Sequence, residues 1–89
     1  AFPAETFVWL VACRAIGVLA DGHVDCQAAL GAEGACEAVV AGLRALPGYR
    51  LVCLAGCRAI RALARGRADH QQKLGELGAC QAMMDTLTA

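Results

Sequence analysis

The sequence predicts an all-α fold of about six helices, arranged as an α-solenoid of roughly two repeats, and three observations support this fold class. Residues 8–45 align without a gap to residues 52–89, and 19 of the 38 aligned pairs are identical, only five of them Ala. Apolar residues recur at steps of three and four, which is the periodicity of a helix that buries one side. No alternating pattern bounded by hairpin turns, the signature of a strand, is present. A helical repeat of about 40–47 residues is typical of solenoids, in which each repeat packs against its neighbours.

The longest helices are expected at about residues 3–20 and 49–65. Pro3 suits the first turn of the first helix, and Gly22 and Gly66 suit the left-handed position just after each helix ends. The apolar residues that share one side are Val8, Ala12, Ala15, Ile16 and Leu19 in the first helix and Val52, Gly56, Ala59, Ile60 and Leu63 in the second. Because the two helices occupy equivalent positions in the repeat, we expect them to run roughly parallel in adjacent layers.

Each long helix is followed by two shorter ones, expected at residues 24–32 and 35–45 in the first copy and at 68–77 and 79–88 in the second. Asp25 and Asp69 fall in the first turn of a helix, where the helix dipole favours a negative charge. Gly34 and Gly78 separate the two short helices of each copy. Pro47, which cannot continue a helix, closes the first copy.

Hydrophobic residues make up 58% of the chain, compared with about 45–50% in a typical globular protein. A single helical repeat cannot bury its own apolar faces, so this excess predicts stacking on further repeats or on another copy through apolar end faces. The formal net charge is zero, which gives no general attraction to nucleic acid or to an anionic membrane, so we expect neither as a partner. The longest nearly apolar run, residues 7–20, is interrupted by Arg14 and is shorter than the about 20 residues of a membrane span.

Six cysteines in 89 residues would suit a small disulfide-linked secreted protein, but the repeat favours another interpretation. Cys13 aligns with Cys57 and Cys36 aligns with Cys80, and each lies inside an apolar helical pattern. A cysteine in such a place packs as a small apolar residue between closely spaced helices. We therefore expect buried, reduced thiols and, with them, an intracellular, cytoplasmic location.

No set of residues predicts a metal site, another cofactor or catalysis. Cys53 and Cys57 lie one helical turn apart, but structural zinc sites need a second pair of ligands, and none is evident. His23 and His70 lie near helix starts, where we expect them to be exposed. The chain has no Ser and no Gly-rich phosphate loop, and the repeat gives no reason for His70 to meet Cys80 as base and nucleophile. The sequence therefore predicts a protein without enzymatic activity.

The order of these segments resembles the armadillo repeat, in which a short first helix is followed by a second helix starting with Gly-Ala and by a longer third helix. Residues 25–33 resemble the first helix, residues 34–43, which begin Gly34-Ala35, the second, and residues 50–66 the third. The resemblance implies one right-handed armadillo-like domain over residues 1–89. Residues 3–22 would be the third helix of one repeat, residues 23–66 a complete repeat, and residues 67–88 the first two helices of the next.

The resemblance also indicates which side could bind a partner. In peptide-binding armadillo proteins, a Trp and an Asn four residues later on the third helix hold the backbone of an extended ligand. These places fall on Arg14 and Val18 in the first copy and on Arg58 and Ala62 in the second. The asparagines are therefore missing, and peptide recognition of the nuclear-import type is not expected.

Arginines stand in the expected groove instead. Arg58, Arg61 and Arg65 are spaced at i, i+3 and i+7, so they share one side of a helix. Arg14 should lie one layer away from Arg58. A guanidinium group can bind a carboxylate or a phosphate through two parallel hydrogen bonds. These four residues are therefore candidates for binding an acidic or phosphorylated protein segment.

The same arginines have a second interpretation, a solvated face whose charges pair with Asp21, Asp25 or Asp69. Trp9 is a separate candidate, as the anchor of an interface, because large aromatic residues are common in binding hot spots. The sequence thus predicts a protein interaction module or scaffold that binds a protein or an acidic peptide. Two alternatives stay open: a structural element that self-associates through its apolar end faces, and a regulatory segment of a larger signalling enzyme.

Overall fold

The computed structural model describes residues 4–46 and 48–88, and the secondary structure within these ranges is entirely helical. The six helices are α1 (Ala4–Ala20), α2 (Val24–Ala32), α3 (Ala35–Ala45), α4 (Arg50–Ala64), α5 (Ala68–Glu76) and α6 (Ala79–Thr88). The predicted all-α class is confirmed, and the predicted helices coincide with the observed ones within the usual uncertainty at helix ends. Pro3 and Pro47, at which a helix start and a turn are predicted, lie outside the described residues.

The repeat in the sequence is matched by a repeat of helix bounds. α2 and α5 begin and end at equivalent positions of the two copies. The turns match as well, because φ is 74° at Gly22 and 71° at Gly66, and 90° at Gly34 and 88° at Gly78. Residues with a Cβ atom rarely adopt these left-handed φ values, so Gly is the suitable residue at all four turns. The two copies therefore share the same turns and the same order of helices, although α1 has 17 residues and α4 has 15.

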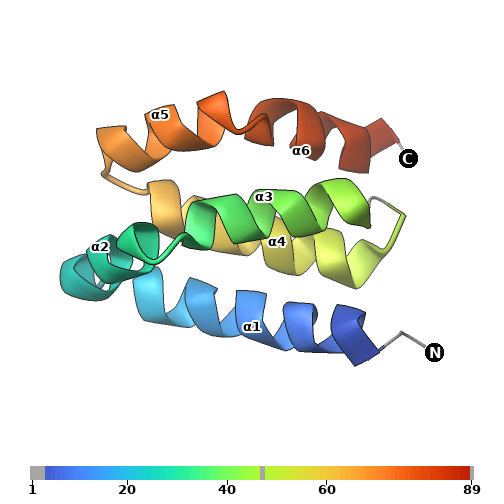
Figure 1. Cartoon of the computed structure of the whole chain (residues 1–89), viewed down its shortest axis with the longest axis horizontal. Coiled ribbons are helices and arrows are strands. Elements are labelled where there is room, and N and C mark those ends of the chain that lie inside the picture. The colour runs from blue at the N-terminus through green and yellow to red at the C-terminus, as the bar shows by residue number, and fades with distance from the viewer. Residues whose placement is uncertain (1–3, 47, 89) are drawn as a thin grey trace.

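The helices are stacked in one direction (Figure 1). In this view α1 lies along one edge, α5 and α6 lie along the opposite edge, and α3 and α4 lie between them. α1 and α4 run in the same direction and pack side by side, as predicted for equivalent helices. α3 packs against α4, and α6 packs against α3. The two ends of the stack are thus formed by α1 and by the α5–α6 pair.

The core is built mainly by α3 and α4. Val39, Leu43, Val52 and Leu63 are almost completely buried, and full burial of a Val or Leu side chain stabilises a fold by about 1.5–3 kcal/mol. On each helix the buried residues recur at steps of three and four, which places them on the side that faces the neighbouring helices. The apolar side predicted for the second long helix is therefore the core side of α4.

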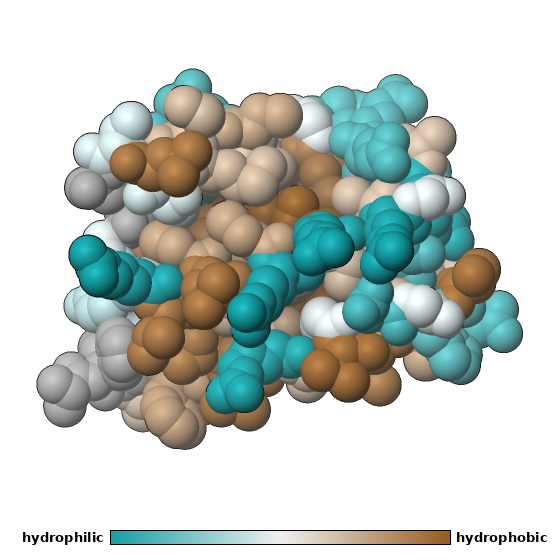
Figure 2. All heavy atoms as spheres, turned by 180° about the vertical axis from the view of Figure 1, so that it is seen from behind, coloured by the Kyte–Doolittle hydropathy of each residue, from teal (hydrophilic) through white to brown (hydrophobic). Residues whose placement is uncertain are grey.

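The equivalent apolar side of α1 is largely exposed. α1 packs on the molecule through the opposite side, where Thr6, Cys13 and Ala20 are buried. The exposed large apolar side chains are Phe7, Val8, Val11, Val18 and Leu19 on α1, Val24 on α2, Tyr49, Leu51 and Leu54 at the start of α4, and Met84 and Leu87 on α6. Figure 2 shows apolar side chains along its lower edge, where α1 runs. Both ends of the stack therefore keep apolar surface in contact with water.

Trp9 packs inside the molecule rather than at an end face. Its indole lies over Gly42 of α3 and Gly56 of α4, where an added Cβ atom would overlap or touch the ring. Its Nε1–H group points at the carbonyl oxygen of Ala38, 3.5 Å away. Because the ring is half-buried against the core, Trp9 stabilises the packing of α1 on α3 and α4. We therefore do not include Trp9 in the binding surface proposed below.

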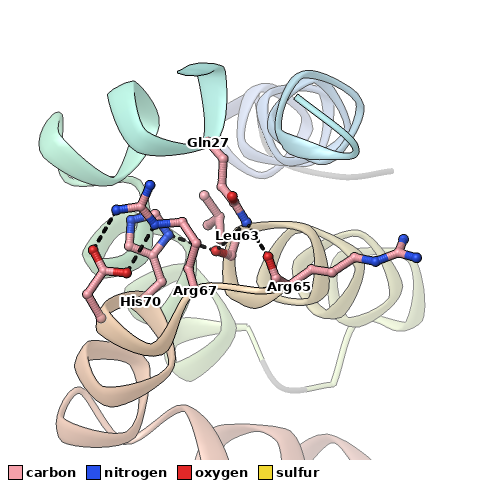
Figure 3. Close-up of polar contacts among 6 residues, drawn as sticks. Gln27, Leu63, Arg65, Arg67 and His70 are labelled. Carbon is pink, nitrogen blue, oxygen red and sulfur yellow. Dashed lines mark hydrogen bonds and ion pairs between the residues drawn. The ribbon is translucent and has the colours of Figure 1, made fainter. Parts of the chain in front are cut away.

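The C-terminal end of α4 is held by two buried polar side chains, one from α2 and one from α5 (Figure 3). Nε2 of Gln27 shares its hydrogens among the carbonyl oxygens of Ala62, Leu63 and Arg65, at 2.9, 3.0 and 2.9 Å. Nδ1 of His70 lies 2.7 Å from the carbonyl oxygen of Leu63, and it donates because that oxygen can only accept. The last carbonyls of a helix have no partner within the helix. The two side chains thus donate hydrogen bonds to carbonyl oxygens that the helix itself leaves without a donor.

The expectation that His70 is exposed is wrong. The ring is buried against Gly31 of α2, with no room for a Cβ atom at that glycine. His23 is exposed as expected, and its Nδ1 accepts a hydrogen bond from the backbone N–H of Cys26 at 3.2 Å, which caps the start of α2. The difference arises because the start of α5 is covered by α2 and α4.

The cysteines follow the prediction in the first copy only. Cys13 and Cys36 are buried, whereas their equivalents Cys57 and Cys80 are half-buried and exposed, and all four are free thiols. Burial raises the pKa of Cys13 to about 12, so this thiol is protonated at neutral pH and is not a nucleophile. Cys80 is exposed because no described helix covers α6 in the way that α4 covers α3.

Candidate functional site

A groove of about 600 Å³ runs between α1 and α4. Its walls are Leu10, Cys13, Arg14, Gly17, Val18 and Asp21 from α1 and the following turn, and Leu51, Leu54, Ala55, Arg58, Arg61 and Ala62 from α4. Figure 2 views the molecule from the side on which α4 lies in front of α3, and it shows hydrophilic side chains crossing this face between apolar ones. The groove thus combines charged groups with apolar surface.

Helical spacing explains how each wall is formed. The lining residues of α1 recur at steps of three or four from Leu10 to Asp21, and those of α4 do so from Leu51 to Ala62. Each set therefore occupies one side of its helix. Gly17 keeps the groove open, because it has no side chain and a Cβ atom there would have no neighbour nearer than 4.0 Å.

Three arginines of the groove are not neutralised by a carboxylate of the described residues. Arg14, Arg58 and Arg61 are exposed, and they take no part in the ion pairs found in residues 4–46 and 48–88. Asp21, the acidic residue of the lining, pairs with Arg65 at 3.3 Å. An exposed ion pair of this kind contributes only about 0–1 kcal/mol to stability. The groove consequently carries an excess of positive charge.

The structure brings three of the four predicted arginines into one groove. Arg14 and Arg58 are equivalent residues of two adjacent helices, and Arg61 follows Arg58 on α4. Arg65 is not part of the lining, and its pairing with Asp21 is the arrangement expected for a solvated face. Arg65 therefore agrees with the second interpretation, whereas Arg14, Arg58 and Arg61 stay candidates for binding a ligand.

Sequence reasoning missed the apolar part of the groove. Leu51 and Leu54 are about half exposed, and Val18 is exposed over most of its surface. The signal was present in the spacing, because Leu51 and Leu54 precede Arg58 by seven and four residues and so share its side of the helix. Gly17 carried no signal, since its effect depends on how closely α1 approaches α4.

Outside the groove, one ion pair of the described residues joins two helices. Lys73 of α5 pairs with Glu37 of α3 at 2.9 Å, and the hydrogen bond from Lys73 lowers the pKa of the Glu37 carboxyl group. Residues 4–46 and 48–88 contain no group of three His, Cys, Asp or Glu side chains placed to hold a metal ion. The groove is therefore the site on which a functional proposal can be built.

None of the described helices combines the length and the apolar character required to cross a bilayer. Comparisons with models of protein families, with curated proteins and with solved structures find no match to this chain. The function is therefore inferred from the groove and its chemistry.

Proposed function

We propose that the chain is an armadillo-like α-solenoid module that binds an acidic segment of a partner protein in the groove between α1 and α4. One observation carries this proposal: Arg14, Arg58 and Arg61, without carboxylate partners among the described residues, line the same groove as exposed leucines. The role proposed is binding rather than catalysis, because the groove contains a protonated thiol and arginines but no paired base and nucleophile.

The repeat supports the armadillo-like, right-handed architecture within this proposal. α2 and α5 have equivalent bounds, the glycine turns of the two copies match, and the two long helices are parallel neighbours. In such a stack the long helices line one face, and the spaces between them form a continuous surface for an extended ligand. The α1–α4 groove would be one step of that surface.

The ligand should combine carboxylates with large apolar side chains. Each guanidinium group can hold a carboxylate through two hydrogen bonds. A hydrogen bond to a charged group contributes about 1.5–3 kcal/mol when sheltered from water, and less at exposed arginines such as these. Leu51, Leu54 and Val18 would add about 25 cal/mol for each Å² of apolar surface that the ligand covers. A segment in which acidic residues alternate with leucines would use both kinds of contact.

Reversing the charge of the groove is expected to remove binding. Arg58→Glu combined with Arg61→Glu should weaken binding of fluorescein-labelled peptides that combine Glu and Leu by at least about tenfold, or about 1.4 kcal/mol. Arg50→Glu is the matched control, because Arg50 lies on α4 and is exposed but does not line the groove. Fluorescence anisotropy measures the affinities, and circular dichroism checks that the variants fold.

A second variant tests the groove rather than its charge. Gly17→Leu leaves every arginine in place but puts a side chain into the space beside α4, so it should also weaken the same peptides. Equal binding to wild type and to both groove variants would contradict the proposal, as would failure of wild type to bind any of the peptides. Preferential binding of a labelled oligonucleotide would contradict it as well and would indicate a nucleic-acid partner instead.

A further inference from the structure

The N-terminal end of the stack exposes apolar side chains whose equivalents inside the stack are buried. Val8 of α1 is 67% exposed, whereas Val52, its equivalent on α4, is 0% exposed. Leu19 and Leu63 differ in the same way. The exposed side of α1 formed by Val8, Val11, Ala15 and Leu19 is named the head face. The two helices carry similar residue types on this side. They differ because other helices cover this side of α4, whereas none of the described helices covers it on α1.

The opposite end of the stack also exposes apolar side chains whose equivalents inside the stack are buried. Leu87 of α6 is 78% exposed, whereas Leu43, its equivalent on α3, is 1% exposed and lies against α4. Met84 is likewise exposed where Val40 is buried. The side of α6 formed by Cys80, Met84 and Leu87 is named the tail face. Among the described residues, no helix takes the place over α6 that α4 takes over α3.

We propose that a second copy of this chain docks on the tail face through its head face, so that copies stack head to tail. The α1 helix of the incoming copy would lie against α6 as α4 lies against α3 within each copy. The residue types fit this placement, because Val8, Ala15 and Leu19 align with the identical residues Val52, Ala59 and Leu63. The interface would thus repeat a contact that the chain already makes internally.

Polar groups at the tail end are placed for the same contact. Gln71 is equivalent to Gln27, which holds the end of α4, but Gln71 is exposed and donates to the carbonyl oxygen of Ala64 at 2.9 Å. In the stack, Gln71 would reach the last carbonyls of the incoming α1 as Gln27 reaches those of α4. Arg65, which pairs with Asp21 of its own chain, would also lie beside Asp21 of the incoming copy. The proposed interface therefore has a polar edge as well as an apolar centre.

The geometry determines the kind of assembly. The two faces belong to helices at opposite edges of the molecule (Figure 1), and they are different surfaces, so the interface is heterologous. A heterologous contact that does not close into a ring continues to grow, and the assembly should exceed a dimer as concentration rises. Val8 and Leu19 do not line the α1–α4 groove, so this contact is separate from the proposed peptide site.

Two double variants test the head-to-tail arrangement. Val8→Glu with Leu19→Glu disrupts the head face, and Met84→Glu with Leu87→Glu disrupts the tail face; all four residues are exposed, so both variants should fold. Sedimentation velocity should show wild type growing in mass from micromolar to millimolar concentration, while each variant alone stays at the monomer mass of 9.2 kDa. An equimolar mixture of the two should form a heterodimer of twice that mass and nothing larger, because one head face and one tail face remain intact.

Val24→Glu is the matched control, since Val24 is an exposed apolar residue whose equivalent, Ala68, is exposed too. It should assemble like wild type. Alkylation of Cys80, followed by peptide mass spectrometry, should slow several-fold as wild type is concentrated, because the tail face becomes covered. A wild-type chain that remains monomeric at all concentrations would overturn the proposal. So would a dimer that both variants abolish and that mixing does not restore, which would indicate a symmetric interface.

Discussion

Gln27→Glu is expected to lower the free energy of unfolding by about 3–5 kcal/mol at neutral pH, the loss typical of leaving a buried charge without a partner. The substitution hardly changes the volume of the side chain, but it replaces the donor Nε2 with an oxygen atom. That oxygen would face the carbonyl oxygens of Ala62, Leu63 and Arg65, which can only accept. The end of α4 would lose one of its two side-chain donors and gain a buried negative charge.

The loss should grow with pH. Burial and the facing carbonyl oxygens would raise the pKa of a carboxyl group at position 27 above the value of about 4.3 expected in the unfolded chain. The folded variant would then bind a proton more tightly than the unfolded one, so its stability falls as pH rises from the unfolded pKa through the raised pKa. Urea unfolding followed by circular dichroism, at about pH 4.5 and about pH 7, should show the larger deficit at the higher pH.

Gln71→Glu is the control for this prediction, because Gln71 is the equivalent residue of the second copy and is exposed. It should cost less than about 1 kcal/mol, since an exposed carboxylate keeps its water and one exposed hydrogen bond is lost. Both variants are best compared at micromolar concentration, where contacts between copies contribute least. Equal losses for Gln27→Glu and Gln71→Glu would contradict the role assigned to Gln27 at the end of α4.

Gly31 and Gly75 are equivalent helical glycines, and their replacement by Ala is expected to change stability in opposite directions. At Gly31 the added Cβ would overlap the ring of His70, and displacing the ring would break its hydrogen bond to Leu63. Overpacking costs about 1–3 kcal/mol, and the hydrogen bond contributes about 0.5–1.5 kcal/mol. Together they exceed the gain of about 0.5–1 kcal/mol from removing a helical Gly. At Gly75 an added Cβ would meet no atom within 4 Å other than those of its neighbouring residues and its own helix backbone, so that gain should appear alone.

Thermal unfolding measures both variants, with a shift in Tm of about 4–8 °C for each kcal/mol in a domain of this size. Gly31→Ala should lower Tm, and Gly75→Ala should raise it. Adding His70→Ala to the Gly31→Ala variant should remove the overlap. His70→Ala should therefore cost less stability in the Gly31→Ala variant than in the wild-type chain. An increase in Tm for Gly31→Ala would show that the ring of His70 does not occupy the space described.

Sequence reasoning predicts the local structure of this chain well, because helix ends depend on nearby residues. Gly34 and Gly78 adopt the left-handed turns at which helices were expected to end. Burial is different, because it depends on what lies beside an element. Cys36 and Cys80 have the same local pattern, yet one is buried and the other exposed, since α3 is covered by α4 and α6 has no equivalent cover.

The candidate site shows the same division. Helical spacing places Arg58 and Arg61 on one side of α4, and the repeat places Arg14 next to them, so these residues could be predicted together. The position of Trp9 could not, because its indole fits over Gly42, a residue of a helix distant in the sequence. The same holds for His70, whose burial depends on contact with Gly31. Both misjudged residues fill space that glycines of other helices leave open.

The matched turns at Gly22 and Gly66 indicate which changes in length the fold would tolerate. A duplication of the segment between these glycines, inserted after Gly66, would join two turns of nearly the same conformation and lengthen the chain by one whole unit. An insertion of one or two residues inside a helix would instead rotate everything after it by about 100° per residue and turn the apolar side away from its neighbours. Evolutionary variation in length is thus expected in whole multiples of the unit.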